Sequence, residues 1–461
     1  MSTHCGYIVK VTQLRPHSNA DKLQIATFFG NDTCVSLEVH ENDVGVYFPS
    51  DLQLSEEYCE INHLCRKKKD GTPDTGYLDE NKRNIRTIKL RGERSDGIYM
   101  PLESFTYTGV KMSELTIGTP ITVLNGHEIC QKYIPRTNRS SSGGNGGAKR
   151  ISKSKAPIAP IFYEHKDTEQ LAYNLDLFKP GDEIEISLKM HGTSQRTAHT
   201  KVLKGYKRTF WDKLFRREGT PIYDWGYVSG TRRVVLDTFD GGFYGSNEFR
   251  KQHHNFFEGK LWKGETVYYE VVGFTHTGVP IMASCDNKKI NDKEFAKMYG
   301  KETVFSYGCD PSGKRLKITN AEYSQAIGIE EVPQSDIYVY RMTMTNEDGE
   351  VVEYTPDFMR YRCELMGVKT VPIFCKVVVT GGIDTNGHPY SVADEVKDLA
   401  ENFYDGPDPI GKTHVREGVV VRILNRPTFT AYKHKNFSFK VLEGIIKDTA
   451  EAPDIEEAQD E

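Results

Sequence analysis

The sequence predicts an α+β fold in two domains, and three observations lead to this prediction. Residues 1 to about 135 carry short strand patterns separated by turns, such as Tyr7–Val11. The next stretch is rich in Ser and Gly, which cannot build a hydrophobic core. Residues 158 to about 446 mix strand patterns with helical segments. We therefore expect a small N-terminal β-domain, a flexible basic linker over 136–157 and a larger mixed domain over 158–446.

The composition favours a globular protein of the cytoplasm. The chain has 461 residues, too many for a single hydrophobic core. It contains no run of about 18 apolar residues and no charged-then-apolar N-terminus, so we expect neither a membrane partner nor secretion. Its nine cysteines are odd in number and include no Cys-x-x-Cys pair, which favours free thiols in a reducing compartment.

The acidic C-terminus accounts for the negative net charge. The segment after Lys447 holds seven acidic residues and no basic one, whereas the whole chain has a formal charge of −5. The rest of the chain therefore carries +2. We expect residues 447–461 to form a disordered tail. The slightly basic body permits a nucleic-acid partner without proving one.

Lys189 ends the most informative strand pattern of the chain. The run Glu183–Lys189 alternates with period two, with aliphatic residues on one face and polar residues on the other. Lys189 should therefore point out of the core, into the cleft that the sheet borders. A turn with Gly192 follows, and glycine lets the backbone approach a ligand closely. This arrangement would offer an amine nucleophile to a nucleotide phosphate.

Two later strand patterns could form the opposite wall of such a pocket. The run 266–273 places Glu270 on its polar face, and the run 337–340 turns Tyr338 and Tyr340 the same way. A carboxylate there could hold a ribose hydroxyl, and a tyrosine could stack on the base.

The last two patterns bring an acid and two cations. The run 416–422 puts Glu417 and a glycine at the head of a buried strand, and the run 431–435 places Lys433 and Lys435 on one strand face. A lysine that attacks an α-phosphorus must first lose its proton, against a reference pKa of about 10.4. Nearby cations would lower that pKa and neutralise the phosphate oxygens in the transition state. Glu417 could hold a metal, since Mg²⁺ favours a few carboxylates plus phosphate oxygens.

Taken in order, these segments resemble motifs I, III, IIIa, IV and V of the covalent nucleotidyltransferases, which comprise polynucleotide ligases and capping guanylyltransferases. Lys-x-His-Gly-Thr-Ser at 189–194 is similar to the RNA-ligase form of motif I, and Ser-Gly-Thr-Arg at 229–232 resembles motif Ia. The resemblance implies that residues 158–446 form an adenylation domain of mixed antiparallel sheets and helices, with Lys189 as the adenylated nucleophile.

The resemblance also implies roles for the other candidates. It implies that the arginine of motif Ia contacts the incoming phosphate, that one of the two tyrosines stacks on adenine, and that Glu417 binds Mg²⁺ or Mn²⁺. The implied catalytic residues are Lys189, Glu270, Glu417, Lys433 and Lys435. The implied ATP-binding residues are Lys189, His191, Gly192, Arg232, Glu270, Tyr338, Tyr340, Glu417, Lys433 and Lys435.

The N-terminal region resembles an OB-fold nucleic-acid-binding module. Pro16–Leu23 is similar to the OB module of tRNA-binding proteins, and Arg86–Gly97 looks like the matching segment of one RNA-ligase family. In that family an N-terminal OB-fold β-barrel precedes the adenylation domain, and the enzymes seal 3′-OH/5′-phosphate nicks in duplexes. The resemblance thus implies an OB-fold over 1–135 and an ATP-dependent RNA ligase. We expect a monomer whose partner is a nicked RNA or RNA/DNA duplex.

Two alternatives stay open. A capping-type guanylyltransferase would use GTP, but capping enzymes and DNA ligases carry an OB domain after motif V. Only about 21 residues follow Lys440, which disfavours both classes. A non-catalytic RNA-binding adaptor would bind RNA and form no covalent nucleotide.

Two basic stretches invite a polynucleotide interpretation, with a solvated surface as the alternative. The stretch in the N-terminal region comprises Arg66–Lys69, Arg86, Lys89, Arg91 and Arg94. The stretch in the larger domain comprises Lys201, Lys204, Lys207, Arg208, Lys213, Arg216 and Arg217, interleaved with Tyr206, Phe210, Trp211 and Phe215.

Overall fold

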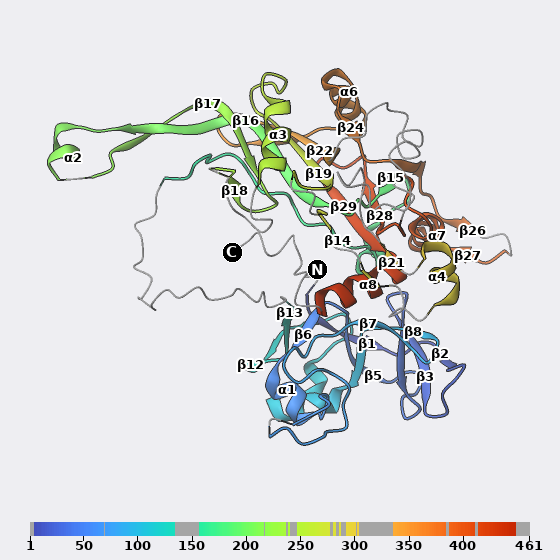
Figure 1. Cartoon of the computed structure of the whole chain (residues 1–461). Helices are drawn as coiled ribbons and strands as arrows, with labels where there is room; N and C mark the ends of the chain where they lie inside the picture. Colours follow the sequence, from blue (N-terminus) through green and yellow to red (C-terminus); the bar gives the residue numbers. More distant parts are fainter. Residues whose placement is uncertain are drawn as a thin grey trace.

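The computed structural model confirms the α+β class, with mostly antiparallel sheets and separate helices (Figure 1). It describes residues 4–68, 70–133, 156–215, 217–236, 238–239, 247–276, 280–282, 285–286, 292–300, 302–303, 335–383, 387–410 and 414–448. The predicted linker lies outside these residues except for its last two positions. The predicted tail lies outside them except for its first two residues, which end the helix α8 (Phe437–Asp448).

The described residues between 4 and 133 form thirteen short strands, one α-helix and two 3₁₀ turns. The strands are β1 (Gly6–Lys10), β2 (Leu14–Pro16), β3 (Leu23–Phe28), β4 (Asn31–Ser36), β5 (Val44–Phe48), β6 (Leu52–Leu54), β7 (Thr87–Leu90), β8 (Glu93–Asp96), β9 (Ile98–Pro101), β10 (Pro120–Ile121), β11 (Val123–Leu124), β12 (His127–Glu128) and β13 (Cys130–Lys132). Helix α1 (Glu56–Ile61) follows β6, and the 3₁₀ turns η1 (Leu102–Thr108) and η2 (Met112–Glu114) follow β9. Antiparallel pairing gives the sheets β10-β1-β5-β9, β2-β3-β4, β7-β8, β11-β12 and β13-β6. The closed OB barrel stays a prediction.

Two sheets form the framework of the larger part. The five-stranded sheet has the order β14-β29-β28-β15-β25, and the seven-stranded sheet runs β18-β17-β16-β19-β22-β23 with β24 beside β22. Their strands are β14 (Glu169–Gln170), β15 (Glu183–Leu188), β16 (Thr193–Lys207), β17 (Thr220–Gly230), β18 (Val235–Leu236), β19 (Glu265–Gly273), β22 (Ser335–Thr345), β23 (Val351–Glu353), β24 (Lys369–Thr370), β25 (Ile373–Val378), β28 (Gly418–Ile423) and β29 (Thr430–Lys435).

Helices and small ribbons surround these sheets. They are η3 (Leu171–Tyr173), η4 (Leu175–Leu177), α2 (Phe210–Leu214), α3 (Glu248–Phe257), β20 (Cys285–Asp286), α4 (Lys293–Tyr299), β21 (Glu302–Thr303), α6 (Pro356–Met366), β26 (Gly382–Ile383), β27 (Pro389–Tyr390) and α7 (Val392–Tyr404). Local sequence signals set several ends. Helix α6 begins after Thr355, whose hydroxyl accepts the N–H of Phe358, and it ends at Gly367 in the left-handed conformation (φ 69°).

Each sheet has its own hydrophobic core. Val267, Tyr269 and Val339 of the seven-stranded sheet pack with α3 and α6. Ile184 and Ile186 of β15 pack with β28 and α7 on one face of the five-stranded sheet. The opposite face of that sheet is left for polar side chains, and it looks toward the seven-stranded sheet.

The N-terminal part packs against the larger part through α8, as Figure 1 shows. Lys440 of α8 forms an ion pair of 2.6 Å with Asp96 of β8, and the carboxylate is almost fully buried. The guanidinium of Arg94 lies 4.7 Å from the ring centre of Phe437. The contact between the two parts therefore has both a charged and an aromatic component.

The structure bears on two expectations drawn from composition. The described cysteines Cys5, Cys34, Cys59, Cys65, Cys130, Cys363 and Cys375 are free thiols, as predicted. In the described ranges, no helix combines the length and the apolar character that crossing a bilayer requires.

Candidate active site

Lys189 lies directly after β15, where the alternation of the strand directs it away from the core. Ile184 and Ile186 are fully buried in the core, whereas Glu185, Ser187 and Lys189 line a pocket on the other face. The backbone N–H of Lys189 donates to the carbonyl of Gly418 at the start of β28, with an N···O distance of 3.0 Å. The predicted alternation is therefore confirmed except at Leu188, which is buried in a separate cluster and also lines the pocket.

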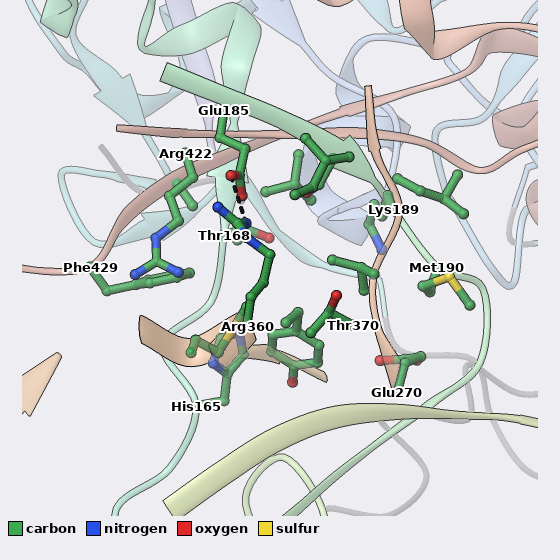
Figure 2. Close-up of a pocket in the computed structure, with 18 of the residues that line it drawn as sticks. His165, Thr168, Glu185, Lys189, Met190, Glu270, Arg360, Thr370, Arg422 and Phe429 are labelled. Carbon is green, nitrogen blue, oxygen red and sulfur yellow. Dashed lines mark hydrogen bonds and ion pairs between the residues drawn. The ribbon is translucent and has the colours of Figure 1, made fainter. Parts of the chain in front are cut away.

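The pocket lies between the two large sheets and contains about 850 Å³ of space, part of it open to solvent. Figure 2 shows side chains from both walls turned toward this space. Its lining includes four of the predicted residues, namely Lys189, Arg232, Glu270 and Tyr340. The pocket therefore brings an amine, a carboxylate, a guanidinium and an aromatic ring to one opening between the sheets.

Glu417, directly before β28, lies close to three of the predicted residues that can carry a positive charge. Its carboxylate lies 2.7 Å from Nζ of Lys189, 3.4 Å from Nζ of Lys435 and 3.5 Å from Nδ1 of His191. Burial alone would raise the pKa of Glu417, but the charges of Lys189 and Lys435, with His191, hold that pKa well below its usual range. Glu417 is therefore an anion at neutral pH.

Gly418 is required by the backbone at this point. Its φ is +144°, and a Cβ atom there would lie 2.1 Å from the carbonyl oxygen of His434 on β29. The close approach of β28 and β29 pairs Gly418 with Lys435 in the strand register, which puts the preceding residue, Glu417, within 3.4 Å of Nζ of Lys435. The Glu-Gly pair of the sequence motif thus has a local structural reason.

A glycine is also needed at position 192, where the backbone packs closely against another strand of the protein. A Cβ atom at Gly192 would lie 2.4 Å from the carbonyl oxygen of Val271 on β19. The turn between β15 and β16 therefore rests on the strand that carries Glu270. The contact of Gly192 with a ligand stays a prediction.

The two predicted tyrosines occupy different environments. Tyr340 lines the pocket, and its hydroxyl lies 3.0 Å from the hydroxyl of Ser194. Tyr338 is buried in an apolar cluster with Leu188 and Val272. A β-bulge between β19 and β22 separates them, because Tyr340 is the extra residue between the paired positions.

Arg232 and Lys433 lie at different edges of the site. Arg232 lines the pocket and forms an ion pair of 3.1 Å with Asp167. Lys433 pairs with Val420 across β28 and β29, and Val420 lines the pocket. Because cross-strand partners share a face, Lys433 stands on the pocket side of the five-stranded sheet.

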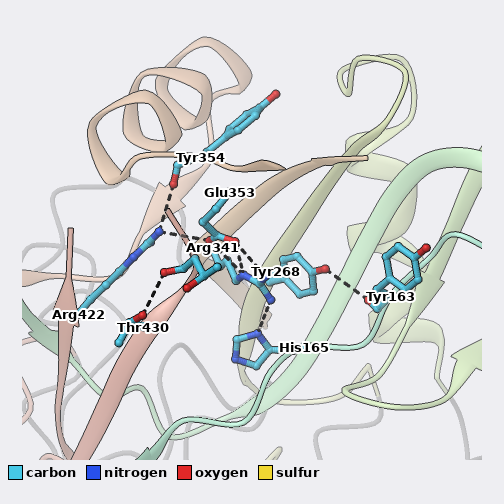
Figure 3. A network of polar contacts seen from close by, with 9 residues as sticks. Tyr163, His165, Tyr268, Arg341, Glu353, Tyr354, Arg422 and Thr430 are labelled. Carbon is cyan, nitrogen blue, oxygen red and sulfur yellow. Dashed lines mark hydrogen bonds and ion pairs between the residues drawn. The ribbon is translucent and has the colours of Figure 1, made fainter. Parts of the chain in front are cut away.

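A buried polar network that the sequence did not reveal joins the two sheets (Figure 3). Glu353 accepts from Arg341 in a bidentate pair of 2.9–3.1 Å and from Arg422 at 3.2 Å. Both guanidinium groups lie within 5.0 Å of the ring centre of Phe429. Arg341 also donates to Nδ1 of His165 at 3.4 Å. This network holds the two walls of the pocket together at one end.

The charge of His165 follows from that environment. Burial, with Arg341, Arg232 and Arg196 nearby, holds the pKa of His165 well below its usual range. The ring is therefore neutral at pH 7, and it makes an edge-to-face contact with Tyr340 at 5.0 Å.

Two more ion pairs near the pocket were missed from the sequence. Arg360 of α6 lies 2.8 Å from Glu185, and both line the pocket (Figure 2). Lys435 lies 2.8 Å from Glu443 of α8. Glu185 could have been found, because it shares the polar strand face with Lys189. Arg360 on α6 and Glu443 on α8 belong to no sequence motif, so the sequence alone did not point to them.

A divalent metal fits this site only if a bound nucleotide supplies part of its coordination shell. Within the described ranges, no group of three or more His, Cys, Asp or Glu side chains could hold a metal ion. Glu417 could supply one carboxylate, and phosphate oxygens and water would complete the shell, as Mg²⁺ prefers. The role of Glu417 as a metal ligand stays a prediction.

No protein-family model and no curated protein matches this chain. Solved structures of Naegleria gruberi RNA ligase do match. A mutant with AMP and Mn has a TM-score of 0.52 at 15% identity, covering 95% of this chain and 98% of that one. An apo mutant has a TM-score of 0.53 at 16% identity with the same coverage, and the complex with PPi has a TM-score of 0.52 at 15% identity.

This likeness extends over nearly the whole chain and establishes the fold. The protein has the fold of these Naegleria gruberi RNA ligase structures.

Proposed function

We propose that this protein is an ATP-dependent RNA ligase that works through a covalent lysyl-AMP intermediate. The observation that carries the proposal is the position of Lys189, whose Nζ lies 2.7 Å from the carboxylate of Glu417 and which lines the same pocket as Glu270. The fold supports it, as do the comparison structures of Naegleria gruberi RNA ligase, which carry AMP and Mn or ATP and Mn.

In the first step, Nζ of Lys189 attacks the α-phosphorus of ATP. A P–N bond forms, the bond from the α-phosphorus to the bridging oxygen breaks, and pyrophosphate leaves with that oxygen. Lys433 and Lys435 neutralise charge that develops on the phosphate oxygens. A divalent metal, when bound, adds positive charge at the same oxygens.

The ion pair between Lys189 and Glu417 sets a condition for this step. A carboxylate at 2.7 Å favours the ammonium form of Lys189, which cannot attack. Lys189 can lose its proton and become nucleophilic once Glu417 turns to another cation, and Nζ of Lys435 already lies 3.4 Å from that carboxylate. The low pKa of Glu417 makes it a poor proton acceptor, so the proton of Lys189 leaves to the triphosphate or to water.

In the later steps, AMP is transferred from Lys189 to the RNA and then released. The 5′-phosphate of a broken strand attacks the phosphorus of lysyl-AMP, which frees Lys189 and gives an adenylylated 5′ end. The neighbouring 3′-OH then attacks that 5′-phosphate and releases AMP. We assign residues 1–135 to an OB-fold module that holds the nicked duplex, and residues 158–446 to the adenylation domain of a monomeric enzyme.

Self-labelling tests the proposal. The full chain is incubated with Mg²⁺ and ATP or GTP labelled at the α-phosphate, then denatured and separated by size. We expect a covalent label from ATP that is lost in Lys189→Ala. Lys251→Ala is the matched control, because Lys251 lies on α3 in an exposed pair with Glu248.

The same experiment decides between the alternatives. Label from GTP alone would indicate a capping-type guanylyltransferase. No label from either nucleotide, together with RNA binding, would indicate an adaptor and overturn the proposed enzyme.

A further inference from the structure

The β16–β17 hairpin projects far from the body of the protein (Figure 1). Its strands pair antiparallel from Arg196 and Gly230 out to Lys207 and Thr220. Strand β16 has 15 residues, so its two ends are roughly 50 Å apart at about 3.3 Å per residue. One end adjoins the Lys189 turn, and the other leads to α2 at the tip.

The outer half of the hairpin is separate from the core. Val202 is the last residue of β16 in a buried cluster, where it packs with Phe162 and Val228. The N–H of Leu203 donates to the carbonyl of Ile158, a contact with the body of the protein. Beyond this point β16 and β17 form a ribbon of two strands, which adds little stability to a fold.

The tip of this ribbon gathers large apolar side chains in solvent. The exposed fraction is 73% for Phe210, 61% for Trp211, 58% for Leu214 and 59% for Phe215. The rings contact each other, with centroids 5.7 Å apart for Phe210 and Trp211 and 6.0 Å apart for Trp211 and Phe215. An exposed apolar patch on an extended arm marks a binding surface.

Cations accompany the aromatic rings along the ribbon. Residues 201–220 contain seven basic and two acidic residues. The guanidinium of Arg217 lies 5.6 Å from the ring centre of Phe215 at the tip. At the base, Nζ of Lys201 lies 4.6 Å from the ring centre of Trp225. Rings that stack on bases, next to cations that meet phosphates, are the means by which proteins hold single-stranded nucleic acid.

We propose that the tip of the β16–β17 hairpin binds unpaired bases of the RNA substrate, far from the break that is sealed. This inference rests on the proposed function. The rings need unpaired bases, because the major groove of an RNA duplex is too deep and narrow for side chains to enter. A membrane is the alternative partner for exposed rings, but a bilayer would contact only the tip. Ring and cation are paired at both ends of the ribbon, which favours a nucleic acid that follows its length.

The length of the hairpin then defines the substrate class. At about 2.8 Å per base pair of an A-form RNA duplex, roughly 50 Å corresponds to about 18 base pairs. The substrate is a structured RNA with its break in a duplex and a single-stranded loop about 18 base pairs away.

Nicked RNA duplexes test this, with arms of about 9, 18 and 27 base pairs closed by an unpaired loop on either side of the break. For the unaltered protein we expect the KM of sealing to be about tenfold lower with the 18-base-pair arm than with the 9-base-pair arm, as stacking of one or two bases provides. In the triple variant Phe210→Ser, Trp211→Ser, Phe215→Ser, this difference should disappear while kcat changes less than about twofold. The charge variant Lys207→Ser, Arg208→Ser, Arg217→Ser should reduce the slope of log affinity against log salt by about 2 to 3.

The matched control is the double variant Val352→Ser, Ile383→Ser, which removes apolar side chains that are 64% and 73% exposed outside the hairpin. It should keep the length dependence. The inference is overturned if the triple variant also keeps it, or if the tip residues bind vesicles of phosphatidylcholine and phosphatidylserine while the RNA profile stays unchanged. Self-adenylation without RNA separates the two proposals. Its absence in the unaltered protein refutes the ligase, whereas intact adenylation with an unaltered length profile refutes only the role of the tip.

Discussion

Lys189 and Glu417 face each other across two neighbouring strands, because the backbone N–H of Lys189 donates to the carbonyl of Gly418, the residue after Glu417. The main chain therefore brings the two residues side by side. Their side chains then meet at 2.7 Å between Nζ of Lys189 and the carboxylate of Glu417.

Replacing Glu417 by Gln should affect both activity and stability. Glu417→Gln leaves the charges of Lys189 and Lys435 without their shared anion, so we expect the free energy of unfolding to fall by about 3 kcal/mol. Adenylation should slow roughly 100-fold or more. Urea unfolding and single-turnover labelling measure the two effects. The control is Glu350→Gln, which removes an exposed carboxylate that accepts from Asn346. Unchanged stability and labelling in Glu417→Gln would contradict the central role of this carboxylate.

Nucleotide affinity should distinguish the two tyrosines. Tyr340→Leu removes a ring that lines the pocket, and we expect the KM for ATP to rise about tenfold with little change in stability. Tyr338→Ala empties part of a buried cluster and should lower the free energy of unfolding by about 3 kcal/mol or more. ATP titration and urea unfolding of both variants provide the comparison. The reverse pattern would assign the base contact to Tyr338.

Acid should destabilise the protein through His434. Burial, with Lys440 and Lys397 nearby, lowers the pKa of His434 from its ordinary value of 6.5 to about 4 in the folded state. The unfolded chain therefore binds more protons between these two values, and stability falls as the pH drops through this window. From pH 7 to pH 5, this residue should account for a loss of about 2 kcal/mol. Urea unfolding at both pH values should show a smaller loss in His434→Phe, and an equal loss would refute the assignment.

The contact between the two parts of the chain can be measured as a coupling energy. Lys440 and Asp96 form a largely buried ion pair, so a double-mutant cycle with Lys440→Met and Asp96→Asn should give a coupling of about 1–3 kcal/mol. The pair Lys397–Glu401, which is exposed within α7, should give less than about 0.5 kcal/mol in the same assay. Equal values for both pairs would show that burial adds nothing to the contact.

The sequence was sufficient where a residue's position follows from strand period. The alternation in β15 correctly separated Ile184 and Ile186 from Lys189, because successive side chains of a strand point to opposite faces of the sheet. The same reasoning brought Glu270 to the pocket from another sheet. It could not separate Tyr338 from Tyr340, because a β-bulge depends on the partner strand.

The network around Glu353 could not be predicted from local patterns. Arg341, Glu353 and Arg422 lie on three strands, and their contacts depend on how the two sheets pack. Glu443 matched no motif in the sequence, whereas helix α8 brings it within 2.8 Å of Lys435. Such partners become visible only when the tertiary fold is known.

Helix α8 connects the N-terminal part to the turn that follows the lysine. The ring of Phe439 contacts that of His191 at 4.6 Å between centroids, while the adjacent residue Lys440 binds Asp96. Two neighbouring residues on one turn of helix therefore serve different partners, so a substitution at either position disturbs a contact of the site or a contact of β8, and the helix is shared by both halves of the chain.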